Sequence, residues 1–360
     1  MNKLITKIGK GQRGVKDLTW SEAKQALRSL IEEQATPLQA GAFLMAMRIK
    51  LEAVPELVAF TATAREYVSP LELPAGLNVV DLPTYGEKHD TFHACIAASI
   101  LAASAGAPVL MHGVESPAVP SDAPRVLAQL GIPTDRQSQG LAEVLRETNF
   151  AYLDLALYHP PLARFLGLRQ EMGVQNLFHQ VARLLNPARA SSQVIGIAHP
   201  PYLEKMAEAT SMFGGGRLLI LQGIEGYPEL SISMGTMMRE LRKGRVFPLN
   251  IKPKDVGLPS GSFQAMSLPS SPSTTSIPEQ EAAWIRKILT NQIRGSSRDW
   301  VVFNAAMLLY AAGMVSSLGA GVPLAQRGLE TGAAGRKLAQ LSAGDRSMST
   351  HVAQREVVHT

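Results

Sequence analysis

Residues 78–111 read NVVDLPTYGEKHDTFHACIAASILAASAGAPVLM. This stretch opens with the apolar pair Val79 and Val80, continues through an alanine-rich segment and ends with the apolar pair Val109 and Leu110. Short apolar runs bounded by turn residues are typical of buried strands, and the longer alanine-rich segment favours a buried helix. Strand, helix and strand in this order are typical of a parallel sheet covered by helices. The stretch therefore predicts an α/β domain.

The same alternation of short apolar runs and helical segments continues beyond residue 111. Further strand candidates are 151–155, 194–198 and 217–221, and 230–234 is a candidate for an added antiparallel strand. Three helical segments follow towards the end of the chain, at 284–293, 300–318 and 324–341. We expect a large domain over residues 76–343, with a mostly parallel central sheet flanked by helices.

Residues 1–75 show helical patterns and no strand pattern. Thr19 and Glu22 have the spacing of a capping box, which marks the start of a helix. Thr36 followed by Pro37 indicates an N-cap and a first helical residue. These signals predict a small all-helical N-terminal domain.

Two segments outside the helices and strands have their own composition. Residues 257–278 are rich in Ser, Pro and Gly and predict a mobile loop, and residues 344–360 predict a frayed tail. The N-terminus lacks the apolar region of a signal peptide, and the apolar run 94–110 is too short and interrupted to span a membrane. Cys95 is the single cysteine, which excludes an intrachain disulfide. We expect a cytoplasmic protein without membrane contact.

The chain is moderately basic, with 35 Lys and Arg against 30 Asp and Glu and a net charge of +5. Many of its cations fall in three groups, and the candidate phosphate contacts among them are Lys7, Lys10, Arg13 and Lys16, then Arg242, Lys243 and Arg245, then Arg286 and Lys287. Segregated positive charge favours a surface that contacts nucleic-acid phosphates. The alternative, that each group is an ordinary solvated face, stays open.

Several short strings resemble the anthranilate phosphoribosyltransferase family, a glycosyltransferase family 3 group with a nucleoside phosphorylase-type fold. They are TPLQAGAFLMAMR at 36–48, YHP at 158–160, LLNP at 184–187 and FNAA at 303–306. Their order and spacing carry the resemblance, which covers roughly residues 1–343. It implies a small helical domain, an α/β domain and dimers formed through the helical domains.

The resemblance also shows where this chain departs from the family. The family holds a ribose pyrophosphate on a glycine-rich GTGGD turn, and the matching residues here are Pro83, Thr84, Tyr85, Gly86 and Glu87. Proline removes a backbone donor and tyrosine adds bulk where the backbone should approach phosphate closely. In the TxNxST run that follows, His93 takes the place of the asparagine.

The second anion motif of the family, KHGNR, reads Met111, His112, Gly113, Val114 and Glu115. Met111 takes the place of the family's lysine, and Glu115 takes the place of its arginine. A neutral and an anionic residue in place of two cations reverse the local electric field for a pyrophosphate. The metal-binding DE pair of the family falls on Pro228 and Glu229, so Glu229 is the residual ligand. Magnesium on a pyrophosphate normally needs at least one or two carboxylates.

One substrate-binding residue of the family is present, and the histidines do not form a metal motif. Arg169 matches the arginine that binds the aromatic acid substrate. The histidines His89, His93 and His112, taken with Cys95, lack the paired ligand spacing of a zinc site.

Family members that lack these motifs form a paralogue group regarded as nucleic-acid binding, which this chain resembles in residues 8–18 and 172–176. We therefore expect a homodimer without cofactor or catalytic residues that binds DNA or RNA with little sequence specificity. The alternative is a glycosyl- or phosphoribosyltransferase with an altered substrate in a rebuilt pocket, which would keep Arg169, His112, Glu229 and Mg²⁺.

Overall fold

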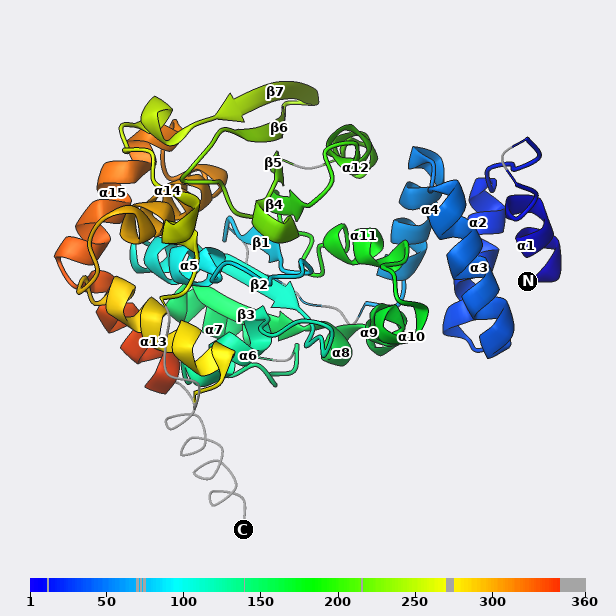
Figure 1. The fold of residues 1–360 in the computed structure, drawn as a ribbon, viewed down its shortest axis with the longest axis horizontal. Coiled ribbons are helices and arrows are strands. Elements are labelled where there is room, and N and C mark those ends of the chain that lie inside the picture. Colours follow the sequence, from blue (N-terminus) through cyan, green and yellow to red (C-terminus); the bar gives the residue numbers. More distant parts are fainter. Residues whose placement is uncertain are drawn as a thin grey trace, which may run out of the picture.

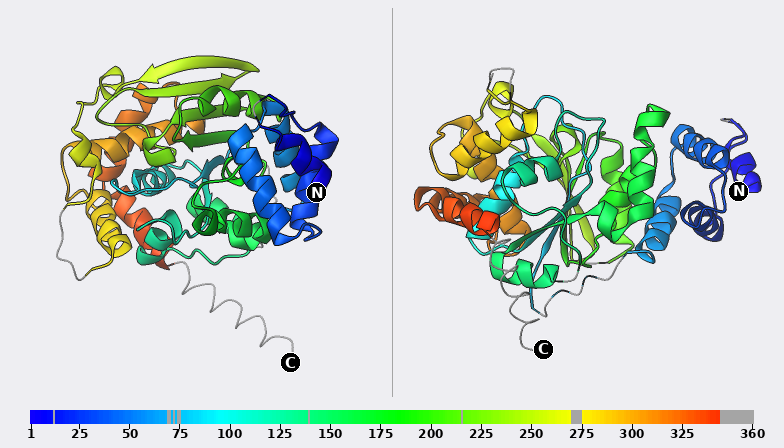
Figure 2. Two further views of the ribbon diagram at one scale, coloured as in Figure 1. Left: turned by 45° about the vertical axis from the view of Figure 1, so that its right-hand side comes forward. Right: turned by 90° about the horizontal axis from the view of Figure 1, so that it is seen from below.

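The computed structural model describes residues 1–11, 13–68, 71, 73, 76–138, 140–214, 216–269 and 275–343. A small helical domain lies beside a larger α/β domain (Figure 1), which confirms the expected fold class. Further views show the helical domain at one end of the molecule and the sheet with its covering helices behind it (Figure 2). The tail expected at 344–360 lies outside the described residues.

The helical domain contains α1 (Asn2–Ile8), α2 (Trp20–Ile31), α3 (Pro37–Lys50) and α4 (Val54–Arg65). The capping box predicted at Thr19 and the N-cap predicted at Thr36 are confirmed, because both hydroxyls accept the amide N–H three residues on. Gln39 completes a capping box at Thr36 as well. Phe43 and Phe60 pack edge to face inside the domain, with ring centroids 6.3 Å apart. The helix starts that the sequence predicts are thus the observed ones, and the apolar faces of these helices form the core of the domain.

One sheet forms the centre of the α/β domain within the described ranges, in the order β3-β2-β1-β4-β5-β6-β7. Its strands are β1 (Val80–Pro83), β2 (Val109–Gly113), β3 (Phe150–Asp154), β4 (Ser192–Ile197), β5 (Arg217–Gln222), β6 (Thr236–Arg242) and β7 (Arg245–Ile251). The pairs among β1 to β5 are parallel, and β6 and β7 add an antiparallel hairpin. The hairpin turns at Lys243 and Gly244, which both have positive φ, as a tight two-residue turn requires.

The antiparallel strand expected at 230–234 is wrong. Residues 230–232 are buried and Met234 is exposed, and side chains instead of a strand ladder bind the backbone N–H groups. The N–H of Leu230 donates to Asn304 Oδ1 at 2.7 Å, and the N–H of Ser231 donates to Thr236 Oγ1 at 2.8 Å. The antiparallel addition to the sheet is the β6–β7 hairpin that follows.

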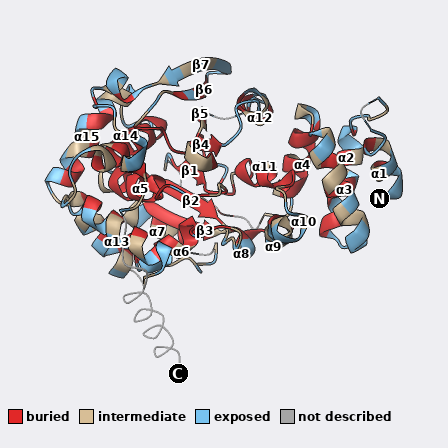
Figure 3. Cartoon of the chain, viewed as in Figure 1, coloured by how far each residue is buried: buried red, intermediate tan, exposed pale blue. Residues whose placement is uncertain are grey.

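Helices cover both faces of the sheet, and the buried residues form a core on each side (Figure 3). On one face lie α5 (Ala94–Ser104), α6 (Ala123–Gln129), α13 (Ile277–Leu289), α14 (Ser296–Ala311) and α15 (Leu318–Glu330). The core of the other face includes residues from α4, α7 (Leu141–Thr148), α8 (Leu155–Tyr158), α9 (Pro160–Gly167), α11 (Phe178–Arg183) and α12 (Tyr202–Ser211). Alternate strand residues divide accordingly, with Val109 in the first core and Leu110 in the second.

The short elements α10 (Arg169–Met172), η1 (Ile224–Gly226), η2 (Pro253–Val256) and η3 (Phe263–Met266) complete the described fold. Within the segment expected to be a mobile loop, residues 257–269 pack Leu258 and Met266 into the core, and the Met266 carbonyl accepts the N–H of Phe92. Residues 270–274 lie outside the described part. No helix in the described ranges has the length and apolar character that crossing a membrane demands.

The close contact between the backbone of β4 and the segment after β5 leads to a prediction about stability. A Cβ on Gly196 would lie 2.1 Å from the carbonyl carbon of Tyr227, so the backbone must move in Gly196→Ala. We expect a loss of roughly 1–3 kcal/mol or more in the free energy of unfolding, measured by urea titration. Gly319→Ala in α15 is the matched control, because its Cβ meets ordinary contacts and alanine favours a helix by about 0.5–1 kcal/mol. Equal stability of the two variants would contradict this account.

Candidate functional site

The loop between β1 and α5 encloses a carboxylate that belongs to the protein itself. Glu225 Oε1 accepts the N–H groups of His89 at 2.6 Å and Asp90 at 3.1 Å, and Oε2 accepts the N–H and the hydroxyl of Thr91. Burial raises the pKa of Glu225, but these hydrogen bonds and the charge of Lys88 together bring it below its ordinary value. Successive backbone N–H groups are the arrangement with which proteins bind phosphate. Here they hold a side-chain carboxylate.

The carboxylate of Glu229 has an equally complete set of partners. Lys88 Nζ lies 2.6 Å from Glu229 Oε2 and 2.7 Å from Thr91 Oγ1, and both charged side chains are buried. The rings of Tyr227 and Trp300 lie 5.2 and 5.3 Å from the same ammonium. Glu229 Oε1 accepts a backbone N–H at the start of α5, at 2.9 Å. An internal ammonium therefore lies where a metal would have to approach this carboxylate.

Behind the loop, Tyr85 and His112 belong to a buried network. The hydroxyls of Tyr85 and Tyr158 lie 2.9 and 3.0 Å from His112 Nδ1 and 2.9 Å from each other. His112 Nε2 lies 3.2 Å from Asp81 Oδ1, an ion-pair distance without hydrogen-bond alignment. Burial raises the pKa of both phenols well above the ordinary value, so they stay neutral. His112 is a fully buried packing residue in this arrangement.

The phenol of Tyr85 leaves little space beside it. The cavity that Thr84, Tyr85 and Gly86 line has a volume of about 60 Å³. That is room for a few water molecules, whereas small-molecule sites usually measure about 300–1,000 Å³. Gly113 is packed against the same loop, because a Cβ there would lie 2.5 Å from Thr84 Oγ1.

Glu87 and His93 each have a charged partner. Arg169 Nε donates to Glu87 Oε1 at 3.0 Å, so the arginine expected to bind an aromatic acid pairs with the loop. Burial raises the pKa of Glu87, and the hydrogen bonds from Arg169 and Gln175 more than offset this and lower it. His93 Nδ1 lies 2.5 Å from Glu281 Oε1 on α13.

Of the predicted pocket residues, the structure places Thr84, Tyr85, Gly86, Glu87, His112, Gly113 and Arg169 around one loop. His93 does not line this cavity and pairs with Glu281 instead. Sequence reasoning missed Lys88, Glu225 and Glu281, which supply the counter-charges. The position of Lys88, directly after Glu87 in the phosphate-loop motif, was the available signal. Nothing in the spacing pairs it with a residue 141 positions away. Among the described residues, no group of three or more His, Cys, Asp or Glu is arranged to hold a metal ion.

The basic groups lie on three separate parts of the molecule. Lys7 pairs with Glu22 at 2.5 Å, whereas Lys10, Arg13 and Lys16 are exposed. Arg242, Lys243 and Arg245 lie at the β6–β7 turn, where the Arg242 guanidinium stacks 4.7 Å from the Phe247 ring. Arg286 and Lys287 lie on α13, at the end of the molecule opposite α1 (Figures 1 and 2). One chain therefore does not align all three groups in one stripe.

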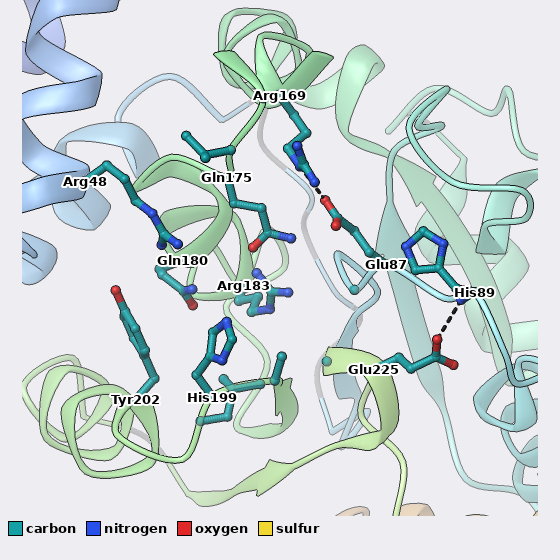
Figure 4. Close-up of a pocket in the computed structure, with 16 residues that line it drawn as sticks. Arg48, Glu87, His89, Arg169, Gln175, Gln180, Arg183, His199, Tyr202 and Glu225 are labelled. Carbon is teal, nitrogen blue, oxygen red and sulfur yellow. Dashed lines mark hydrogen bonds and ion pairs between the residues drawn. The ribbon is translucent and has the colours of Figure 1, made fainter. Parts of the chain in front are cut away.

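A wider cleft opens between α3 and the α/β domain (Figure 4). Its volume is about 400 Å³, and Arg48, Gln180, His199 and Tyr202 are among its lining residues. The loop that holds Glu225 also lines it, through Glu87 and His89, whereas the residues of the buried network around His112 are not among its lining residues.

The sequence matches the helical bundle domain of the glycosyl transferase family over residues 2–68 and the a/b domain of that family over residues 77–335. The chain therefore belongs to this glycosyl transferase family. Within it, the chain is similar to proteins named anthranilate phosphoribosyltransferase. It is 31% identical to that of Natronomonas pharaonis over 341 residues, covering 95% of this chain and 98% of the relative. It is also 31% identical to that of Haloarcula marismortui over 342 residues, covering 95% and 99%.

Solved structures agree with this assignment. The anthranilate phosphoribosyltransferase of Thermus thermophilus superposes with a TM-score of 0.81 at 28% identity, covering 94% of this chain and 98% of that one. The Saccharomyces cerevisiae protein in complex with PRPP and Mg has a TM-score of 0.80 at 18% identity, covering 96% and 98%, and shows the shared fold.

The buried pair of Lys88 and Glu229 generates a second prediction. Lys88→Met leaves the Glu229 charge buried without a counter-ion, which should cost about 3–5 kcal/mol of unfolding free energy. The double variant Lys88→Met/Glu229→Gln removes both charges and should recover part of that loss. Chemical denaturation of both variants measures the difference. If Lys88→Met is as stable as the wild type, the ion pair does not stabilise the fold.

Glu225 generates a pH-dependent prediction. Because its folded pKa lies below the ordinary value of 4.5, its charged form stabilises the fold fully above that value and loses this contribution as the pH falls through the folded pKa. Glu225→Gln should therefore lose stability relative to the wild type at neutral pH, and the deficit should shrink in acid. Unfolding curves between neutral pH and pH ~3 measure this. The exposed Glu171→Gln is the control, and a pH-independent deficit in Glu225→Gln would refute the role of its charge.

Proposed function

We propose that this protein is a nucleic-acid-binding homodimer on a phosphoribosyltransferase fold, without cofactor, and that it does not transfer phosphoribosyl groups to anthranilate. The observation that carries the proposal is the occupation of the loop amides by Glu225 and of the Glu229 carboxylate by Lys88. Transfer from a ribose pyrophosphate requires stabilisation of the leaving pyrophosphate by donors and cations. In this chain the loop amides already bind Glu225, and the cation Lys88 already binds Glu229.

The residues present do not fit a magnesium ion. Magnesium takes oxygen ligands in near-octahedral geometry, and Pro228 provides no side-chain oxygen beside Glu229. Both oxygens of Glu229 already accept hydrogen bonds, one of them from an ammonium that would repel a metal. The proposed function therefore contains no metal-dependent step.

An exposed apolar stripe on the helical domain supports a homodimer. Leu38, Ala42, Met45 and Ile49 recur on one face of α3, and Leu38 and Ile49 are 83% and 76% exposed. The opposite face of the same helix is buried in the domain through Phe43 and Met47. A second copy of the chain would cover this stripe through a self-complementary contact.

The N-terminal segment is the part of the basic surface that a dimer formed through α3 would bring close to its two-fold axis. Helix α1 packs beside α3, and Gln39 Nε2 donates to Asn2 Oδ1 at 2.7 Å. Lys10, Arg13 and Lys16 make no ion pair with any residue that the structure describes. Unpaired cations near a two-fold axis suit the phosphates of one nucleic-acid strand or duplex. The hairpin cations and those on α13 would lie further from that axis.

The second candidate is phosphoribosyl or glycosyl transfer with an altered acceptor. The names of the relatives and the open cleft beside Arg48 favour it. Turnover of anthranilate with phosphoribosyl pyrophosphate and magnesium at an ordinary enzyme rate of ~1 per second would overturn the proposed loss of activity and show that the acceptor is not altered.

The proposal predicts a salt-dependent affinity for nucleic acid that the N-terminal cations determine. The plot of log affinity against log salt should lose about 0.9 in slope for each cation that neutralises a duplex phosphate. The variant Lys10→Ala/Arg13→Ala/Lys16→Ala should therefore bind DNA with a slope smaller by up to about 2.7 per chain. Fluorescence anisotropy with two unrelated duplexes over a range of salt measures the slope, and both sequences should respond alike.

A variant of equal charge controls this experiment. Arg286→Ala/Lys287→Ala/Arg294→Ala removes three cations near the opposite end of the molecule and should leave the slope unchanged. A reduced slope in this variant alone would move the contact surface to α13. If the wild type binds neither DNA nor RNA at low salt, the nucleic-acid function is wrong.

A further inference from the structure

The cleft between the helical and α/β domains brings together side chains from distant segments. Arg48 comes from α3, Gln180 from α11, and Tyr202 from the start of α12 with His199 just before it (Figure 4). Its volume of about 400 Å³ falls within the range of small-molecule sites. The cleft is thus large enough for a ligand, unlike the cavity beside Tyr85.

Of the three guanidinium groups that line the cleft, two are committed to the protein. Arg183 donates to the carbonyl oxygens of Gly196, His179 and Tyr85 at 3.1, 2.6 and 2.7 Å. Arg169 pairs with Glu87. Arg48 makes no hydrogen bond or ion pair with the described residues, so a permanent cation with free N–H donors faces the cleft.

The cleft also contains an unused acceptor and two rings. Gln180 Oε1 is buried and accepts no hydrogen bond from the described residues. Leaving such an atom unpaired is costly, and a ligand N–H group would satisfy it. The rings of His199 and Tyr202 lie on the wall next to Gln180 (Figure 4). Burial raises the pKa of Tyr202, so its ring stays neutral.

We propose that this cleft binds a nucleotide unit without a metal ion. The phosphate would pair with Arg48, the base would lie against His199 and Tyr202, and a base N–H would donate to Gln180. The unit is either a free nucleoside monophosphate or the 5′-terminal nucleotide of a strand. The second source rests on the proposed function, and the first does not.

The loop amides and the arginine that binds the aromatic acid in the family are already paired within the protein. The amides of residues 89–91 hold Glu225, and Arg169 is paired with Glu87. An aromatic acid without a phosphate would therefore find one free cation and would lack the second anchor that a nucleotide base finds at Gln180.

Calorimetric titration of the full chain at low salt tests the proposal. Adenosine monophosphate and uridine monophosphate should each bind saturably at one site per chain, and inorganic phosphate and anthranilate should bind more weakly. Arg48→Ala should weaken nucleotide binding about 10- to 100-fold, the effect of losing a charge-assisted hydrogen bond. Gln180→Leu should weaken it less, and Arg48→Lys should fall between Arg48→Ala and the wild type. Arg294→Ala, which removes a cation outside the cleft, should bind as the wild type does.

Oligonucleotides distinguish the two sources of the nucleotide. A 5′-phosphorylated strand should bind more tightly than the same strand with a 5′-hydroxyl, and Arg48→Ala should remove that difference, if the site takes a strand end. Equal binding of the two strands assigns the site to free nucleotides. The inference is overturned if neither monophosphate binds at millimolar concentration, if folded Arg48→Ala binds them unchanged, or if anthranilate binds as tightly. The proposed function fails separately, if the wild-type protein does not bind the 5′-hydroxyl strand at all.

Discussion

The buried ion pair between Lys88 and Glu229 is the interaction on which the rest of the site depends. It joins the loop after β1 to the segment after β5, and the same carboxylate accepts a backbone N–H at the start of α5. Burying two charges is favourable only when the remaining hydrogen-bonding groups are satisfied, and Thr91 meets that condition for the ammonium. A loop fixed in this way presents its next amides to Glu225. Lys88 and Glu225 are thus internal partners of the Glu229 carboxylate and of the loop amides, and the proposed loss of activity rests on these two contacts.

Much of the fold was predictable because local signals and the apolar pattern agree. The capping boxes at Thr19 and Thr36 mark the true starts of α2 and α3, and the run at 78–111 contains β1, α5 and the first half of β2. The β6–β7 hairpin was missed because its strands carry charged residues and Pro248, which weaken the strand pattern, and because an edge strand needs no continuous apolar face.

The site was predictable where the change of a single motif residue has a direct physical consequence. The bulk of Tyr85 and its consequence for the phosphate loop followed from the motif alone, and the structure places its hydroxyl against His112. The pairing of Lys88 with Glu229, and of Glu225 with the loop amides, joins segments more than 130 residues apart. Such contacts depend on strand order and crossover connections, which sequence spacing does not specify.

The central claim is that internal side chains occupy the positions that a ribose pyrophosphate and its metal would need. The most direct test is a calorimetric titration of the protein with phosphoribosyl pyrophosphate, in parallel in magnesium and in a metal chelator. The account predicts that magnesium adds no saturable binding, because Lys88 holds Glu229 and Glu225 holds the loop amides. Saturable binding that appears only with magnesium would contradict it.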